Sequence, residues 1–161
     1  MVDLQKVDSQ VASFLSTIET TFEVVEIDPD LADTADFCRE YNYPLDQAAN
    51  TLVVASKRGP KVFSCCVVLA TTRLDVNRRV KGLMEVSRVS FATAEQMAEL
   101  TGMEVGGVTP FGIPEDVPMY VDSRVMACDW IILGSGNRDA KIKIAPAVFD
   151  EIPNAQVIEN L

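Results

Sequence analysis

The spacing of hydrophobic positions changes along this chain, and the changes indicate short helices and short strands. Apolar residues recur every three or four positions over residues 3–19, which predicts an amphipathic helix. A β-rich run over residues 22–27 predicts a strand. Asp33 can cap a second helix, whose apolar side ends before Pro44. The first third of the chain is therefore expected to be helix, strand, helix.

The middle of the chain contains a hairpin pattern. Two β-rich runs, residues 51–56 and 62–70, are joined by the polar turn KRGPK. Farther on, Thr93 and Gln96 stand at the spacing of a capping box and predict the start of a helix. The same reasoning predicts helices at 75–83, 93–100 and 146–150, and strands at 86–91, 119–121, 130–133, 142–144 and around Val157.

Strands interleaved with short helices, with a hairpin among them, favour one α/β domain. We expect a mixed, barrel-like β-sheet with helices packed outside it, rather than a doubly wound parallel sheet. The 161 residues show no repeat or linker, so residues 1–161 are interpreted as a single domain. No apolar run approaches the roughly 20 residues of a membrane span, and the first residues lack the pattern of a secretion signal. A cytoplasmic location without membrane contact is expected.

Charge is distributed unevenly. The formal net charge is −10, and residues 1–46 hold eleven acidic and two basic residues, a balance of −9. The acidic excess argues against nucleic-acid binding over that part of the chain. A local basic cluster is a candidate surface for a polyanion such as tRNA, although such a cluster is also typical of a solvated helix face. The cluster comprises Arg73, Arg78, Arg79, Lys81 and Arg88.

The chain contains no histidine, so its chemistry must proceed without imidazole. Its four cysteines include no Cys-x-x-Cys pair, and Cys65 and Cys66 are expected to point to opposite faces of a strand. We therefore predict reduced, half-buried thiols and neither a metal site nor a cofactor.

The most distinctive segment is TGMEVGGVTPFGIP, residues 101–114, which holds four glycines and two prolines. Gly106 and Gly107 can adopt positive φ, and Pro110 fixes the turn that follows them. Such a loop can direct successive backbone N–H groups at a carbonyl oxygen or a phosphate. Two further segments, AANTLVV at 48–54 and GSGNR at 134–138, are separated from it by strands that can bring all three together.

The order of these segments resembles the YbaK/ProX family of aminoacyl-tRNA editing domains, also called the prolyl-tRNA editing or EbsC-like family. LTGMEVGGVTPFG is the specific part, and the resemblance extends from about residue 20 to the end. It implies a freestanding trans-editing deacylase that hydrolyses the ester between a wrong amino acid and the 3′-terminal adenosine of a tRNA. Aminoacyl-tRNA is the implied partner, and an aminoacyl-tRNA synthetase is a further candidate.

The resemblance also implies roles for individual residues. The glycine-rich loop of the family contacts the aminoacyl group and its carbonyl, which assigns the reaction centre to Gly106, Gly107, Val108, Thr109 and Pro110. Water and the ribose hydroxyl of the substrate are thought to act there in place of a protein nucleophile, as oxyanion stabilisation by backbone donors permits. Substrate-binding candidates around it are Phe111, Gly112, Asp122, Gly134, Ser135, Gly136 and Arg138, among which Asp122 is equally well explained as a helix cap and Arg138 as a surface residue.

Asn50 departs from the family pattern. Relatives carry a lysine directly before the TLVV strand, whereas asparagine is uncharged and shorter. Either Asn50 serves a different substrate by hydrogen bonding, or hydrolysis has been lost and the domain only binds an aminoacyl group, a small molecule or a protein. A hydrolase of small esters or amides unrelated to tRNA is a third interpretation, favoured by the acidic charge. The sequence specifies neither the amino acid recognised nor the oligomeric state.

Overall fold

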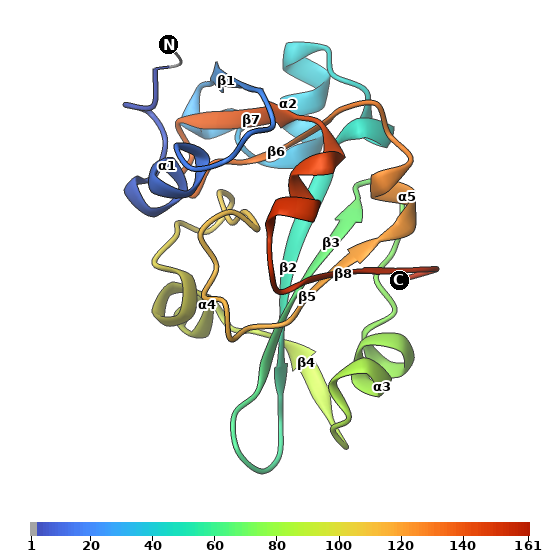
Figure 1. The fold of residues 1–161 in the computed structure, drawn as a ribbon. Helices are drawn as coiled ribbons and strands as arrows, with labels where there is room; N and C mark the ends of the chain where they lie inside the picture. Colours follow the sequence, from blue (N-terminus) through green and yellow to red (C-terminus); the bar gives the residue numbers. More distant parts are fainter. Residues whose placement is uncertain (1–2) are drawn as a thin grey trace.

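Two β-sheets form the framework of the computed structural model, which describes residues 3–161 (Figure 1). The larger sheet has the strand order β4-β2-β3-β5-β8, and the smaller has the order β1-β7-β6. The strands are β1 (Phe22–Glu26), β2 (Ala49–Ser56), β3 (Phe63–Leu69), β4 (Val89–Phe91), β5 (Met119–Asp122), β6 (Ile131–Gly134), β7 (Ala140–Ile144) and β8 (Ala155–Ile158). Each lies where the hydrophobic pattern predicted a strand.

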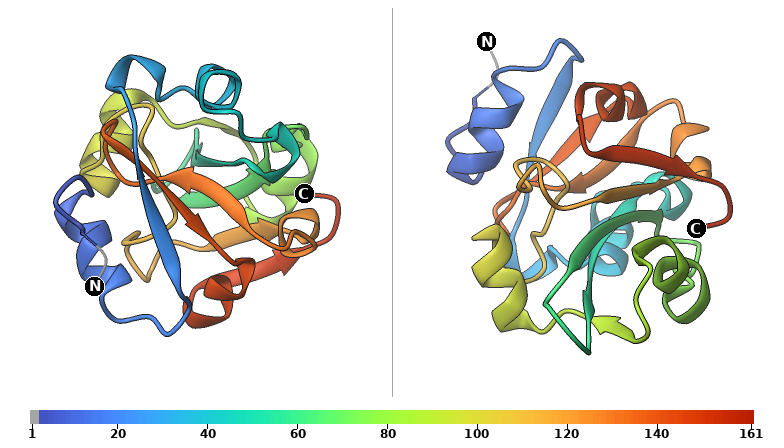
Figure 2. Two further views of the ribbon diagram at one scale, coloured as in Figure 1. Left: turned by 90° about the horizontal axis from the view of Figure 1, so that it is seen from above. Right: turned by 60° about the horizontal axis from the view of Figure 1, so that its bottom comes forward.

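Short helices lie between the strands, mostly around the outside of the sheets (Figure 2). The α-helices are α1 (Ser9–Leu15), α2 (Thr34–Tyr41), α3 (Lys81–Met84), α4 (Ala94–Thr101) and α5 (Ser123–Met126). Three 3₁₀ segments, η1 (Pro29–Leu31), η2 (Leu45–Gln47) and η4 (Pro146–Glu151), and the π-helical turn η3 (Val76–Val80) complete the chain. Among residues 3–161, no helix has the length and apolar character needed to cross a membrane.

The predicted helix ends are confirmed where capping chemistry is strong. Thr93 and Gln96 form a reciprocal capping box at the start of α4. The first helix is shorter than predicted, because Asp8 accepts hydrogen bonds from the N–H groups of Gln10 and Val11 and so caps α1 within the apolar pattern. The basic segment predicted as one helix is η3 followed by α3.

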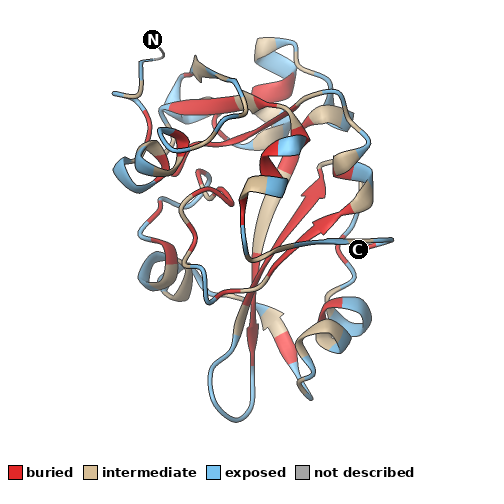
Figure 3. Cartoon of the chain, in the orientation of Figure 1, coloured by how far each residue is buried: buried red, intermediate tan, exposed pale blue. Residues whose placement is uncertain are grey.

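The larger sheet is mixed, as predicted. β2 and β3 form the expected antiparallel hairpin, with Asn50 opposite Val68, while β3 pairs with β5 and β5 with β8 in parallel. The hairpin turn projects from the body of the molecule and is exposed (Figure 3). Residues on one face of β3 enter the core between the sheets, and residues on its other face pack towards η3 and α3.

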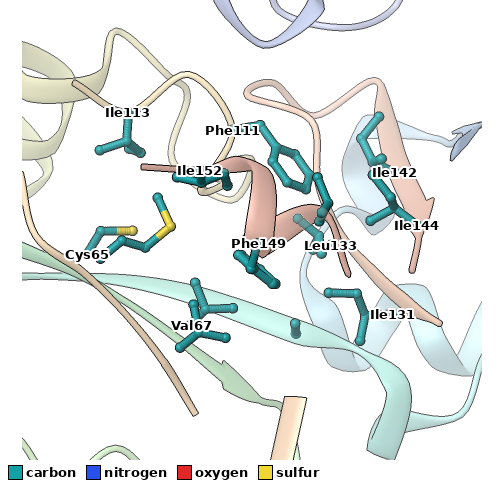
Figure 4. Packing of buried hydrophobic residues seen from close by; sticks show 14 of the residues in the cluster. Cys65, Val67, Phe111, Ile113, Ile131, Leu133, Ile142, Ile144, Phe149 and Ile152 are labelled. Carbon is teal, nitrogen blue, oxygen red and sulfur yellow. The ribbon is translucent and has the colours of Figure 1, made fainter. Parts of the chain in front are cut away.

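The main core lies between the two sheets and the helices α1 and η4 (Figure 4). Cys65 belongs to this core, whereas its neighbour Cys66 belongs to a second cluster on the α3 side, which confirms that they point to opposite faces. Both thiols are fully buried rather than half-buried. A third cluster, around Phe37, packs α2 against the outer face of the smaller sheet.

The sheets do not close into the barrel-like arrangement expected from the sequence. They meet through a single parallel bridge between Ala48 and Ile132, beside the starts of β2 and β6. Beyond that bridge the two strands have no further ladder pairing with each other among the described residues. The single-domain α/β prediction with mixed sheets is confirmed, and barrel closure is replaced by a split between two sheets.

Candidate functional site

A cavity of about 310 Å³ opens where β2 and β6 separate. Asn50 and Gly134, each two residues beyond the Ala48–Ile132 bridge, both line it. Gly106 and Val108 of the glycine-rich loop also line it, so residues of all three predicted segments meet at this cavity. The full lining consists of Asp33, Thr34, Ala49, Asn50, Thr51, Leu52, Val53, Phe91, Ala92, Met97, Gly106, Val108, Gly134 and Lys141.

The glycine-rich loop packs backbone to backbone against the turn at residues 134–138. The Gly107 carbonyl accepts a 2.7 Å hydrogen bond from the Gly136 N–H, and the Gly107 N–H donates to the Glu104 carbonyl at 3.0 Å. Gly106 has the predicted positive φ, +87°, but Gly107 does not. Gly107 is required for a different reason, since a Cβ there would lie 2.3 Å from the Asn137 carbonyl oxygen.

The second half of this loop is anchored in the core. Phe111 is fully buried and stacks on Phe14 with ring centroids 5.5 Å apart. Gly112, with φ +85°, passes close to the backbone of Gln10 in α1. Neither residue lines the cavity, and both hold the loop in place; their substrate-binding roles stay predictions.

Thr109 and Pro110 are also buried and lie outside the cavity lining. The Thr109 hydroxyl has no hydrogen-bond partner among the described residues. Because Gly107 uses its N–H internally, the loop donors that remain for a ligand are the N–H groups of Gly106 and Val108, which donate to no other group of residues 3–161.

Asn50 is half-buried at the wall of the cavity opposite the loop. Its side-chain oxygen accepts a 2.7 Å hydrogen bond from the hydroxyl of Thr34, the first residue of α2. The side-chain amide N–H groups of Asn50 therefore remain as donors. Thr51, whose hydroxyl is buried and has no partner among the described residues, adds a second polar group to this wall.

Lys141 of β7 also lines the cavity, and sequence reasoning missed it. Its side chain is almost completely buried, and its Nζ lies 5.5 Å from the centre of the Phe37 ring in α2. Burial lowers the pKa of the Lys141 ammonium from its ordinary value. Lys141 and Lys143 alternate with Ile142 and Ile144, a pattern that predicts lysines facing solvent. In the structure the aromatic side chains of α2 cover the face of the sheet on which Lys141 lies.

Arg138 does not line the cavity. Its guanidinium donates to the Pro29 carbonyl at 2.9 Å and pairs with the Asp33 carboxylate at 3.2 Å, and it also contacts the Val105 carbonyl. These bonds tie the glycine-rich loop to the segment before α2. Asp33 is the residue before α2, as predicted, but its carboxylate forms no cap hydrogen bond and lines the cavity instead.

Three other predicted substrate-binding residues have structural partners. Asp122 is completely buried, caps α5 and pairs with Arg124 at 2.7 Å, which favours the helix-cap interpretation. The Ser135 hydroxyl donates to the Ala140 carbonyl at 2.7 Å, within the turn. Gly136 has φ +92° and packs against Asp8. All three lie outside the cavity lining.

The basic cluster lies along hollows that adjoin the cavity. One hollow shares Leu52 and Phe91 with the cavity and includes Arg73, and the next shares Asp75 with that hollow and includes Arg78 and Arg79. Lys81 and Arg88 line a further hollow, which includes Lys57 and shares Asn77 and Val89 with the hollow that contains Arg73. A continuous surface therefore leads from the cavity past Phe91 to three of the arginines.

The cysteines do not supply a nucleophile to the site. Burial raises the pKa of the Cys65 thiol and raises the pKa of Cys66 to about 12, so both stay protonated near neutral pH. Within the described part of the chain, no three His, Cys, Asp or Glu side chains are grouped in a way that would hold a metal ion.

Comparison with known proteins agrees with the sequence resemblance. Residues 28–152 match the family model "Aminoacyl-tRNA editing domain". Proline--tRNA ligase of Bacillus licheniformis is 37% identical over 75 residues, 45% of this chain, but the match covers only 13% of that enzyme. The Enterococcus faecalis protein named "Putative Cys-tRNA(Pro)/Cys-tRNA(Cys) deacylase EbsC" is 28% identical over 110 residues, which is 68% of this chain and 65% of that protein.

A solved structure described as that of "a putative trans-editing enzyme for prolyl tRNA synthetase" has the same fold, with a TM-score of 0.78, 24% identity, and coverage of 93% of each chain. Because the family model covers most of the chain and the three segments that resemble the family meet at one cavity, this protein belongs to the aminoacyl-tRNA editing domain family.

Proposed function

We propose that this protein is a trans-editing hydrolase that removes a wrong amino acid from the 3′-terminal adenosine of a tRNA, with residues 1–161 acting as a single domain. The observation that carries the proposal is the cavity shared by Asn50, the Gly106–Val108 segment and Gly134. The loop side of the cavity consists of Gly106 and Val108, whose N–H groups donate to no other group of residues 3–161, which suits a reaction that develops charge on a carbonyl oxygen.

The reaction is an addition followed by an elimination. A water oxygen bonds to the ester carbonyl carbon, and the carbonyl electron pair moves onto oxygen, where the Gly106 and Val108 N–H groups can donate hydrogen bonds. The C–O bond to the ribose then breaks, and the ribose oxygen takes up the proton that the water loses. The chain has no histidine and no cysteine lines this cavity, so the proton passes between the attacking water, the ribose oxygens and the ionisable side chains of the lining, Asp33 and Lys141.

The tRNA has a route to this cavity. Phe91 and Leu52 border both the cavity and the hollow that contains Arg73, and Arg78 and Arg79 lie beyond it. A 3′ end that passes Phe91 would place its phosphates near these arginines, and its ester in the cavity.

A binding module without hydrolysis is the second candidate, and the neutral Asn50 at the position of the family lysine favours it. The two are separated by incubating the purified protein with a panel of tRNAs, each carrying a different amino acid, and measuring loss of the ester. Release of at least one amino acid well above the uncatalysed rate supports the hydrolase. Retention of every ester, together with specific binding of an aminoacyl-adenosine, would establish the binding module instead.

A further inference from the structure

Lys141 holds its ammonium in an unusual place. Only 6% of the residue is exposed, and β7 presents it between Val25 of β1 and Gly134 of β6. Among the interactions of residues 3–161, its Nζ takes part in no ion pair and donates no hydrogen bond, and it lies 5.5 Å from the centre of the Phe37 ring. Cys38, Arg138 and the Asp33 carboxylate are near enough to act on its charge without contacting it. Three N–H donors are therefore directed into a buried, partly polar space without a protein acceptor.

Burying an ammonium without an acceptor costs free energy unless a ligand supplies the hydrogen-bond acceptor. Desolvation of an unpaired ammonium disfavours the folded state, and the lowered pKa of Lys141 has the same origin. Lys143, two residues along the same strand, offers a contrast: its Nζ lies 4.4 Å from the Trp130 ring, and the residue is outside the cavity lining. The two lysines share a strand and an aromatic contact, but only Lys141 reaches the cavity.

The cavity has two ends, and Lys141 is at the one away from the tRNA route. The wall formed by β2 runs from Ala49 to Val53, roughly 13 Å at the rise of an extended strand. Near Val53 lie Phe91 and the hollow that leads to Arg73, because β4 pairs with this end of β2. Near Asn50 lie Thr34 and, across the split, Gly134 with its ladder partner Lys141.

We infer that Lys141 contacts the side chain of the amino acid to be removed, and that the cavity selects amino acids whose side chains carry a hydrogen-bond acceptor over aliphatic ones of equal size. This inference rests on the proposed editing function, since it orients the substrate with its adenosine at Phe91. The Asn50 amide supplies a further polar contact at the same end. An alanine or valine side chain would leave the buried ammonium without a partner, which disfavours binding.

The test compares amino acids that differ in a side-chain hydroxyl: threonine with its isostere valine, and serine with alanine. We expect kcat/KM for tRNAs carrying serine or threonine to exceed that for the same tRNAs carrying alanine or valine. Lys141→Met should lower the values for serine and threonine by roughly ten- to a hundredfold, the loss typical of one charge-assisted hydrogen bond. It should raise those for alanine and valine, because the unpaired ammonium that disfavours them is gone. Lys143→Met is the matched control and should change neither. An equal loss on all four substrates, or a wild-type preference for alanine and valine, would overturn the inference.

The same question can be asked without hydrolysis. Stable amide analogues, adenosines that carry serine or alanine on a 3′-amino group, should bind the wild type with a preference for serine that disappears in Lys141→Met. If this preference is present while no ester is cleaved, Lys141 has the inferred role and the hydrolase proposal is wrong. If esters are cleaved but neither the rates nor the analogues distinguish serine from alanine, the hydrolase stands and the role of Lys141 is wrong. If no ester is cleaved and no analogue binds, the hydrolase proposal and the role of Lys141 are both wrong.

Discussion

Lys141 is a residue that the fold carries at a cost in stability. Its ammonium is buried without a carboxylate partner among the described residues, and replacement by a similarly shaped apolar side chain removes the desolvation penalty. We expect Lys141→Met to raise the free energy of unfolding at pH 7 by about 1–3 kcal/mol, the usual penalty of a buried unsatisfied donor, or the melting temperature by about 2–4 °C for each kcal/mol. Chemical denaturation of both proteins measures this, and a less stable variant would mean that the lysine has a structural role.

The pH dependence of this difference has a definite sign. Because burial lowers the pKa of Lys141, the unfolded chain holds that proton more tightly than the folded one. The penalty is fully present below the folded pKa and disappears as the pH rises towards about 10.4, the pKa in the unfolded chain. The wild type should therefore approach the stability of Lys141→Met as the pH rises from neutral to about 10. A difference that stayed constant over this range would show that the lysine is not the titrating group.

Asn50 provides a second test at the same scale. Asn50→Lys restores the residue of the family pattern and should raise deacylation of at least one mischarged tRNA by roughly ten- to a hundredfold, because it adds one charge-assisted contact. Asn50→Met, of similar length but uncharged, is the control and should give no gain. Rapid wild-type hydrolysis that falls in Asn50→Lys would show instead that asparagine is an adapted specificity residue. The double variant with Lys141→Met reports whether two ammonium groups in one cavity repel each other.

At the scale of elements, the site depends on how closely two glycine segments approach. A Cβ on Gly134 would lie 2.7 Å from the carbonyl oxygens of both Gly107 and Val108, so any side chain there must displace the loop. We expect Gly134→Ala to reduce turnover by roughly a hundredfold, since a displacement of about 1 Å at a reaction centre has effects of that size. Gly82→Ala is the control: its Cβ would meet no atom within 4 Å, and alanine should stabilise α3 slightly. Full activity in Gly134→Ala would show that the glycine-rich loop is not part of the reaction centre.

The elements and the cavity differ in how far the sequence could predict them. The strands, the hairpin and the capping box could be predicted, because periodicity and capping chemistry depend only on residues that are close together in the sequence. The meeting of Asn50, Gly106 and Gly134 followed from the family resemblance and is seen in the structure. Lys141 was missed because its burial depends on α2, a segment about a hundred residues away, covering β7. For the same reason the stacking of Phe111 on Phe14 could not be predicted, since it is a long-range contact.

At the scale of the whole molecule, the tRNA route that we propose begins at Phe91. This side chain is 54% exposed although it is large and apolar, and it borders both the cavity and the adjoining hollow. An exposed aromatic ring at the mouth of a cavity can stack on the terminal adenine, a contact worth about 1–3 kcal/mol. Phe91→Ala should weaken binding of an aminoacyl-adenosine by roughly five- to a hundredfold in calorimetry and leave the fold intact. Val157→Ala, at a similarly exposed site on β8, should leave binding unchanged.

The basic cluster supplies the longest-range prediction, because it must act through phosphates and not through the aminoacyl group. Arg78→Glu with Arg79→Glu should weaken tRNA binding strongly at low salt and much less at high salt, and should reduce the slope of log K against log salt by roughly 0.7–0.9 for each phosphate that is no longer neutralised. Binding of a small aminoacyl-adenosine should not change, since both arginines lie beyond the hollow that contains Arg73. The control, Arg58→Glu with Lys61→Glu, alters the net charge equally at the exposed hairpin turn, at two residues that line none of these hollows. If the two double variants weaken tRNA binding equally, the effect comes from the overall charge of an acidic protein, and the arginines at η3 do not guide the tRNA to the cavity.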